Sequence, residues 1–327
     1  PGGTGKSRLL LEAARATGTP SMVFVDSGAD WTAADIQALP TGPLILVFDD
    51  AHRRPDLDRL IAACLDQNDL IRFIVSCRPS ALGIVRPHLS AITTGGSGPE
   101  QIDLPQLPKA PALQLAKSSL GSKFEHLAEQ LVRIADTNPL VITVGGRCIA
   151  IKDVSPQVLD HTPEEFRALV LERLLQDPAI SQSSTPYRRR LLEVLSAIGP
   201  VGAEDEPTRE LLAKFFEVHE FEIVQELDEL ETVGFIQRRG RLLRIVPDVL
   251  ADHLLYRASV DRKGRPTGFL DTVVQAFTPQ FLASILANGA ELDWRAAATN
   301  AHEPVLKATW EAIQNELPQL TNRDRAE

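Results

Sequence analysis

The chain has 327 residues, of which 43% are hydrophobic and 24% are charged, and its formal net charge is −10. This composition excludes global disorder, and the length predicts two or more domains. The three scattered cysteines exclude a disulfide framework, no apolar run reaches the roughly 18 residues of a membrane span, and no segment has the pattern of a secretory signal. We therefore expect a cytoplasmic protein without membrane contact, and the acidic balance argues against one that coats nucleic acid.

The first seven residues, PGGTGKS, carry the strongest motif in the sequence. They match the last seven positions of the phosphate-binding pattern G-x-x-x-x-G-K-[ST], so we expect the chain to begin inside this motif and to lack the strand before it. Small residues let backbone N–H groups face phosphate oxygens, and the following helix presents its positive end to the same anion. The predicted nucleotide-binding residues are Gly2, Gly3, Thr4, Gly5, Lys6, Ser7 and Arg8. Lys6 would contact the outer phosphates, and the Ser7 hydroxyl would contact Mg²⁺.

Short apolar runs alternate with helical patterns over residues 1–104. The pattern predicts helices over 7–16 and 56–65, and strands over 22–25, 44–48, 71–76 and 102–104. Such alternation is typical of an α/β fold with a parallel sheet, here a P-loop NTPase core whose first strand is missing. The missing strand would lie between the last two predicted strands, which we therefore expect about 9–10 Å apart.

Charged residues follow two of the predicted strands. Asp49 and Asp50 come after the strand at 44–48, and Arg78 comes after the next one. The carboxyl ends of parallel strands meet at one edge of a sheet, where ligands bind. Asp49 is expected to hold Mg²⁺ together with Ser7, and Asp50 is the candidate that orients the attacking water. Arg78 either senses the γ-phosphate or caps its strand at the surface. Because the histidines show no ligand spacing, no metal other than Mg²⁺ is predicted.

Helical patterns replace the strands from about residue 105 onward. The predicted order is helices over 110–120, 125–136, 139–151 and 162–176, a linker at 181–186, helices over 188–198, 208–218 and 221–233, a hairpin of 235–238 with 242–246, and further helices at 249–257 and within 269–320. Thr162 is expected to cap its helix, with Glu165 three residues on. The chain would thus contain a helical lid at 105–180, a winged-helix domain at 185–258 and the start of a helical, repeat-like region at 265–327.

The helix at 221–233 is too acidic to suit a DNA groove. Its apolar spacing predicts that Phe221, Val224, Leu227 and Leu230 are buried and that its acidic residues face outward. The nearest basic residues are the run at 188–190 and the arginines of the predicted wing, namely Arg238, Arg239, Arg241 and Arg244. We expect the acidic face to meet basic residues within the chain or between protomers, and nucleic acid is not an expected partner.

These motifs together resemble the STAND class of P-loop NTPases, relatives of the NB-ARC proteins, over roughly residues 1–258. The resemblance rests on GGTGKS, LILVFDD, SCRP, the Asn-Pro-Leu helix start at 138–140 and the winged-helix order. It implies that Arg78 is a nucleotide sensor and that Pro139 packs against adenine, whereas the sequence pattern by itself makes Pro139 only a helix start. Where the family often has Met-His-Asp, this sequence has Val246-Pro247-Asp248. Asp248 therefore matches the family, and proline replaces its histidine.

The resemblance implies an ATP-binding signal-transduction switch with weak or regulated ATP hydrolysis. ATP or ADP with Mg²⁺ would be bound, the nucleotide state would be read by the winged-helix and C-terminal helical domains, and effector and sensor domains would lie outside this chain. The activated protein is expected to form a homo-oligomer. Two alternatives remain: a DNA-binding winged-helix transcription regulator with an ATPase core, and a motor-type AAA-like ATPase that turns over rapidly without a trigger.

Overall fold

The computed structural model describes most of the chain as two compact units, Pro1–Asp177 and Pro178–Glu327. The described residues are 4–16, 21–25, 31–54, 56–92, 99–151, 154–175, 187–202, 204–239, 241–297 and 303–316. Gly2, Gly3 and the predicted linker at 181–186 lie outside these residues. The division of the chain into four domains is finer than these two units and stays a prediction. Among the described residues, none of the helices combines the length and the apolar character that crossing a membrane requires.

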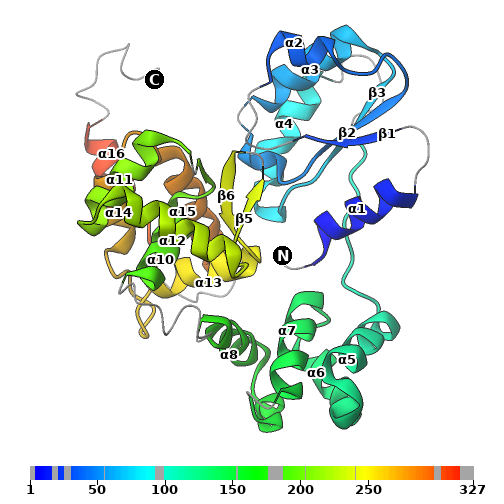
Figure 1. Ribbon diagram of the computed structural model, residues 1–327, viewed down its shortest axis with the longest axis vertical. Coiled ribbons are helices and arrows are strands. Elements are labelled where there is room, and N and C mark those ends of the chain that lie inside the picture. The colour runs from blue at the N-terminus through cyan, green and yellow to red at the C-terminus, as the bar shows by residue number, and fades with distance from the viewer. Residues whose placement is uncertain are drawn as a thin grey trace. The chain divides into compact units, whose positions relative to one another are not determined.

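The first unit contains a three-stranded parallel sheet in the order β1-β2-β3 (Figure 1). Its strands are β1 (Ser21–Phe24), β2 (Leu44–Phe48) and β3 (Ile71–Val75). The helices of this region are α1 (Lys6–Ala16), α2 (Ala33–Gln37), α3 (Leu57–Gln67) and α4 (Leu82–Ile92), with short 3-10 turns η1 (Ala51–Arg53) and η2 (Pro79–Ala81). The continuous apolar run of β2 suits the central strand, which is covered on both faces. The alternation of strands and helices confirms the predicted α/β order in this region.

One face of the sheet forms an apolar core with α3 and α4. Alternate β2 side chains, Leu44, Leu46 and Phe48, project onto this face because successive residues of a strand point to opposite sides. Their partners include Leu57, Leu60, Ile61 and Cys64 of α3 and Val85 of α4. This packing fixes α3 and α4 against the sheet. Neither α2 nor α4 was predicted from the sequence.

The predicted strand at 102–104 is wrong. Residues 99–108 form neither helix nor strand, and Ile102 is 82% exposed. A strand needs a neighbour whose N–H and C=O groups complete the ladder, and prolines at 99, 105 and 108 contribute no N–H. The alternation of Ile102 and Leu104 about one polar residue therefore imitated a strand. The prediction of a gap between this strand and β3, wide enough for a missing strand, is therefore also wrong.

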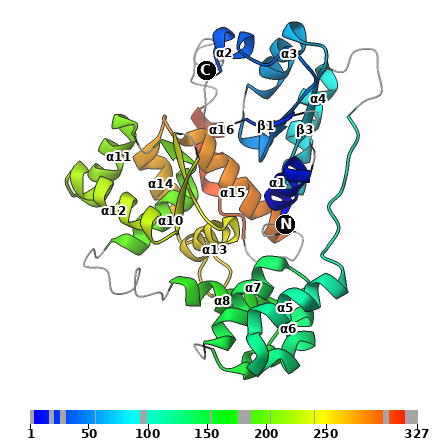
Figure 2. The same ribbon diagram turned by 45° about the vertical axis from the view of Figure 1, so that its right-hand side comes forward.

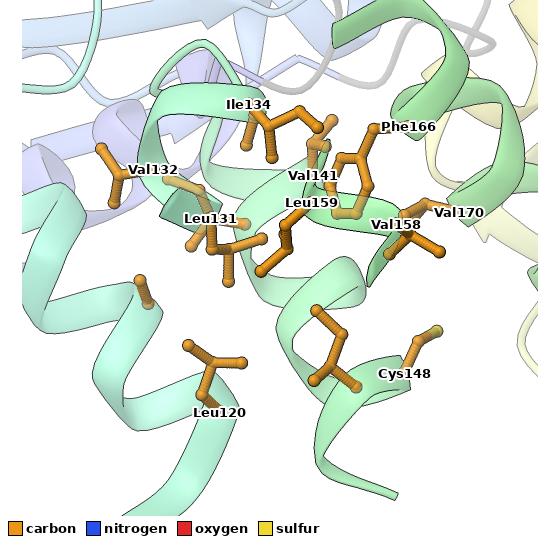
Figure 3. Packing of buried hydrophobic residues seen from close by; sticks show 14 of the residues in the cluster. Leu120, Leu131, Val132, Ile134, Val141, Cys148, Val158, Leu159, Phe166 and Val170 are labelled. Carbon is orange, nitrogen blue, oxygen red and sulfur yellow. The ribbon is translucent and has the colours of Figure 1, made fainter. Parts of the chain in front are cut away.

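The rest of the first unit is a helical cluster (Figure 2). It contains α5 (Lys109–Phe124), η3 (Glu125–Leu127), α6 (Ala128–Ile134), α7 (Pro139–Ala150), η4 (Pro156–Asp160) and α8 (Pro163–Leu175). The predicted cap of α8 is confirmed: the Glu165 N–H donates to Thr162 Oγ1 at 3.3 Å, and the Thr162 N–H donates to Glu165 Oε2 at 3.0 Å. Buried side chains of these elements, including Leu131, Ile142 and Phe166, form one apolar core, part of which Figure 3 shows.

Two adjacent glycines allow α7 to pack closely against its neighbours. A Cβ on Gly146 would lie 2.6 Å from the Cβ of Ser119 on α5, and a Cβ on Gly145 would lie 2.6 Å from Cζ of Phe166 on α8. Real Cβ atoms do not approach other atoms so closely, so neither position has room for a side chain. The Gly-Gly pair therefore sets the spacing of the helices in this cluster.

The second unit combines helices with a three-stranded antiparallel sheet in the order β4-β6-β5. Its elements are α10 (Arg188–Ile198), β4 (Val201–Gly202), α11 (Glu206–Phe216), α12 (Glu220–Thr232), β5 (Ile236–Arg239), β6 (Leu242–Ile245), α13 (Asp248–Ser259), α14 (Phe269–Phe277), α15 (Leu282–Ala297) and α16 (Lys307–Glu316). The predicted hairpin of β5 and β6 is confirmed. The two-residue strand β4, which pairs with β6, was not predicted.

The helix α10 is the central element of the second unit. Leu191, Leu192, Ala197 and Ile198 on this helix are fully buried, and α13, α14 and α15 all contact it. Asn288 of α15 donates its amide hydrogens to the carbonyl oxygens of Ala197 at 2.8 Å and of Gly199 at 3.0 Å. These carbonyls lie at the end of α10, where a helix leaves its last acceptors without an internal partner. The amide thus fixes α15 to α10, so α14 and α15 belong to the same compact unit as the hairpin.

The buried face of α12 differs from the predicted one. Phe221 is 74% exposed, and the buried residues are Ile223, Glu226, Leu227 and Leu230. Ile223, Leu227 and Leu230 follow the i, i+4, i+7 spacing of an inward stripe, whereas the prediction started this stripe two residues earlier. The expectation that every acidic residue of this helix faces outward is wrong for Glu226.

The burial of Glu226 has a partner on α10. The Arg188 guanidinium donates to Glu226 and also to Glu229, and both Arg188 and Glu226 are almost fully buried. A buried charge is tolerated when an opposite charge and hydrogen bonds compensate for lost hydration. Arg238 of β5 pairs in turn with Glu231 at 3.4 Å and with Glu204 at 3.3 Å. The predicted pairing of acidic and basic residues within the chain is confirmed for these residues.

Candidate functional site

The site begins at the N-terminus of α1. Gly5 has a φ of +90°, which side-chain-bearing residues rarely adopt, and its carbonyl oxygen accepts the Leu9 N–H at 2.8 Å. Lys6, Ser7 and Arg8 therefore occupy the first helical turn, whose N–H groups point out of the helix end. No acidic residue lies in this turn. The helix thus presents its positive end and the Lys6 side chain where the sequence predicts a phosphate.

The ends of β2 and β3 meet at one edge of the sheet. Phe48 pairs with Val75 in the parallel register, so Asp49 and Ser76 are the next residues on neighbouring strands. The Ser76 N–H continues the ladder to the Phe48 carbonyl oxygen at 2.8 Å. The Ser76 hydroxyl donates to Asp49 Oδ1 at 2.6 Å. The register between β2 and β3 therefore positions the Asp49 carboxylate beside Ser76.

The same carboxylate joins the sheet to α1. The Ser7 hydroxyl donates to Asp49 Oδ2 at 2.6 Å, across 42 positions of sequence. Each oxygen of Asp49 thus accepts one serine hydroxyl, at a distance typical of strong bonds to a carboxylate. Because the Ser7 hydroxyl donates its hydrogen bond to Asp49, the lone pairs of the Ser7 oxygen remain for a cation. A hydroxyl and a carboxylate are hard oxygen donors of the kind that Mg²⁺ prefers, so these residues fit the predicted ion.

The turn after β2 holds Asp50 in an unusual conformation. Asp50 has φ 54° and ψ 44°, in the left-handed region that aspartate tolerates better than most residues, and it is buried. Its N–H donates to the Ser76 hydroxyl at 3.1 Å, and the next N–H, of Ala51, donates to the Ser76 carbonyl oxygen at 2.8 Å. The turn that carries Asp50 is therefore tied to the end of β3 by two hydrogen bonds.

Lys6 and Asp50 both act on the thiol of Cys77. Burial raises the pKa of the Cys77 thiol above its usual range, the positive charge of Lys6 lowers it, and the negative charge of Asp50 raises it. The pKa of the Cys77 thiol therefore depends on the charges of two predicted site residues. The next residue, Arg78, is 4% exposed, so the alternative of a surface arginine is wrong. Its contact with a γ-phosphate stays a prediction.

Three predicted site residues have other surroundings. Arg8 forms an exposed ion pair with Glu12 at 2.8 Å along α1. Pro139 is the first residue of α7 in the helical cluster, where the Asn138 side chain caps the helix by accepting the Leu140 N–H at 3.1 Å. Asp248 begins α13 in the second unit. The nucleotide contacts of these three residues stay predictions.

Sequence reasoning gave no role to Ser76, although this residue links Asp49 with Asp50. The sequence shows only a hydroxyl at the end of a buried apolar strand, which is a common feature. The β2–β3 register, which places this hydroxyl beside Asp49, is needed to recognise its role. Elsewhere in the parts of the chain that the structure describes, no three His, Cys, Asp or Glu side chains gather as metal ligands.

No protein-family model matches this sequence, and no curated protein is significantly similar to it. Among solved structures, the chain is similar to a Walker-type ATPase of Pyrococcus abyssi, with 17% identity and a TM-score of 0.31. The match covers 64% of this chain and 63% of the length of that ATPase. A similarity of this degree carries no argument about function, so the assignment rests on the geometry of the chain itself.

Proposed function

We propose that this chain binds ATP with Mg²⁺ and hydrolyses it slowly, as the nucleotide-binding core of a signalling switch. The observation that carries the proposal is the hydrogen bond of 2.6 Å between Ser7 and Asp49. It brings the serine of a G-K-S motif at a helix N-terminus to the aspartate at the end of a buried strand. Phosphate and Mg²⁺ require this combination of a positive helix end and hard oxygen donors.

Each residue of the site has a distinct part in this proposal. The loop N–H groups of residues 2–5 and the Lys6 ammonium bind the phosphates, while Ser7 and Asp49 hold the ion. A bound Mg²⁺ would neutralise charge on the β- and γ-phosphates. Asp50, held in its turn at the sheet edge, orients the attacking water. Buried Arg78 supplies a positive charge for the γ-phosphate.

The switch part of the proposal concerns the remaining helices. Pro139 would pack against adenine from the lid, which favours adenine over guanine, and Asp248 is proposed as a further nucleotide-binding residue. The order α10, β4, α11, α12, β5, β6 supports a winged-helix domain that reads the nucleotide state, followed by helices that continue toward a sensor. A switch of this kind requires ATP and ADP to stabilise different arrangements. The activated form would be a cytoplasmic homo-oligomer.

The test is ATP binding by the full-length protein, measured by isothermal titration calorimetry with and without Mg²⁺. Lys6→Ala should weaken binding of Mg²⁺–ATP by about tenfold or more, because it removes a charge-assisted contact worth about 1.5–3 kcal/mol. The matched control is Arg15→Ala, which removes an exposed cation from the last turn of the same helix and should leave binding unchanged.

Hydrolysis separates the roles of the two aspartates. Asp50→Asn should spare ATP binding and slow phosphate release, because it removes the carboxylate that orients water but leaves Ser7 and Asp49 in place. Phosphate release from radiolabelled ATP measures this effect. Absence of any ATP affinity in the wild-type protein, with or without Mg²⁺, would contradict the proposed function.

A further inference from the structure

Ser76 occupies the junction between β3 and the turn that follows β2. Its backbone makes two hydrogen bonds, to the Phe48 carbonyl oxygen and from the Ala51 N–H, each at 2.8 Å. Its hydroxyl makes two more, donating to Asp49 Oδ1 at 2.6 Å and accepting the Asp50 N–H at 3.1 Å. The residue that follows β3 is therefore bonded to four successive residues of the neighbouring strand and turn.

We propose that Ser76 is a positioning residue for the metal-binding carboxylate, an inference that rests on the proposed function. In this role the Ser76 hydroxyl is not itself a ligand of Mg²⁺. It holds Asp49 Oδ1, so that Oδ2 remains directed toward Ser7 and the first turn of α1. Hydrogen-bonded partners behind a ligand commonly set the orientation of that ligand in this way.

The donor count supports this assignment. A serine hydroxyl can donate one hydrogen bond. The Ser76 hydroxyl donates it to Asp49, and its oxygen accepts the Asp50 N–H. The orientation of the Ser76 hydroxyl is thus fixed by two different neighbours. Because a donor holds each Asp49 oxygen, the carboxylate plane cannot rotate without breaking one of two short bonds. The Asp49 carboxylate is thus already oriented before an ion binds to it and to Ser7. Less side-chain conformational entropy is then lost on binding.

The same hydroxyl couples the two aspartates. Asp50 is buried and left-handed, and its N–H has the Ser76 oxygen as acceptor. Removal of the hydroxyl therefore releases one oxygen of Asp49 and leaves a buried N–H without this acceptor. The position of the ion ligand and the conformation of the water-orienting residue should change together.

The experiment compares the Mg²⁺ dependence of nucleotide binding in full-length variants. A fluorescent ATP analogue is titrated in EDTA and then over a series of Mg²⁺ concentrations, and thermal unfolding checks that each variant is folded. Ser76→Ala should bind the analogue like wild type in EDTA but should require about 10-fold or more Mg²⁺ for half-maximal enhancement. Ser76→Cys keeps nearly the same volume with a much weaker donor and should fall between the two. Ser76→Thr keeps the hydroxyl and should restore the wild-type Mg²⁺ requirement.

The matched control is Ser196→Ala, which removes a buried hydroxyl that donates to the Glu193 carbonyl oxygen within α10. It should leave the Mg²⁺ requirement unchanged. An unchanged Mg²⁺ requirement in both Ser76→Ala and Ser76→Cys would overturn the inference while leaving the proposed function standing. Equal weakening in EDTA and in Mg²⁺ would also overturn it, because a general structural defect does not distinguish the two conditions. A wild-type protein that binds no nucleotide would reject the proposed function itself.

Discussion

Arg188 of α10 and Glu226 of α12 form an ion pair inside the second unit. Glu226 is 2% exposed and Arg188 is 5% exposed, and the same guanidinium also donates to Glu229. The attraction between the buried charges offsets the hydration that both groups lose. Removal of one group leaves the other dehydrated without this compensation, which destabilises the fold. The pair therefore links the central helix of this unit to the acidic helix next to it.

Removing one partner of this pair should destabilise the second unit strongly. Glu226→Gln removes the buried carboxylate and leaves Arg188 with the exposed Glu229 as its charged partner, and we expect a loss of up to about 3 kcal/mol in the free energy of unfolding. Urea unfolding followed by circular dichroism measures the change. The control Glu193→Gln weakens the more exposed pair with Arg190, where a loss below about 1 kcal/mol is expected. Equal losses in the two variants would contradict the role of the buried pair.

The Gly-Gly pair of α7 gives a second stability prediction. Gly146→Ala places a Cβ 2.6 Å from Ser119 Cβ and 3.3 Å from the Ser119 carbonyl carbon, and such overpacking costs about 1–3 kcal/mol. This exceeds the gain of roughly 1 kcal/mol that alanine brings to a helix interior, so the variant should be less stable. Gly83→Ala in α4 is the matched control, because nothing lies within 4 Å of its added Cβ. That control should be neutral or slightly stabilised in thermal unfolding.

Cys77 offers a chemical probe of the site. Burial raises the pKa of its thiol, so the reactive thiolate is scarce near neutral pH and alkylation by iodoacetamide should accelerate as pH rises. Because the Lys6 charge lowers this pKa, Lys6→Ala should raise the pKa further and slow alkylation at a fixed pH. Mg²⁺–ATP should protect Cys77, and peptide mass spectrometry separates it from the two other cysteines. Equal protection of Cys77 and buried Cys148 would instead indicate a general tightening of the fold.

The sequence predicted best where one physical signal dominated. The run of β2 is apolar without interruption and is bounded by Pro43 and Asp49, so its limits were predicted correctly. Ser7 and Asp49 were expected together because a motif and a strand end each have a defined place in a parallel sheet, and the structure brings them into contact. These signals are local or depend only on the direction of the strands.

The errors came from features that depend on a partner elsewhere in the chain. Ile102 and Leu104 alternate like a strand, but a strand exists only where a neighbour accepts its hydrogen bonds. Phe221 is apolar and occurs at helical spacing, yet α12 places it outside and buries Glu226, because Arg188 on another helix compensates for the charge. Ser76 went unnoticed because its position beside Asp49 follows from the β2–β3 register.

The surface of α12 predicts the absence of DNA binding. Glu222, Asp228 and Glu229 on this helix are exposed, and the helix contains no lysine or arginine. Phosphates on both sides of a groove would repel this surface, and Arg238 of the hairpin already pairs with Glu204 and Glu231.

The measurement is fluorescence anisotropy of a labelled random duplex with the whole chain at about 50 mM salt, where non-specific electrostatic binding is strong. We expect no change in anisotropy at micromolar protein. Arg241→Glu, which reverses an exposed charge in the hairpin turn, should leave this result unaltered. Binding that weakens steeply with added salt, and that Arg241→Glu abolishes, would favour a transcription regulator over a switch. Such binding would place the contact on the hairpin arginines rather than on α12, which carries no lysine or arginine.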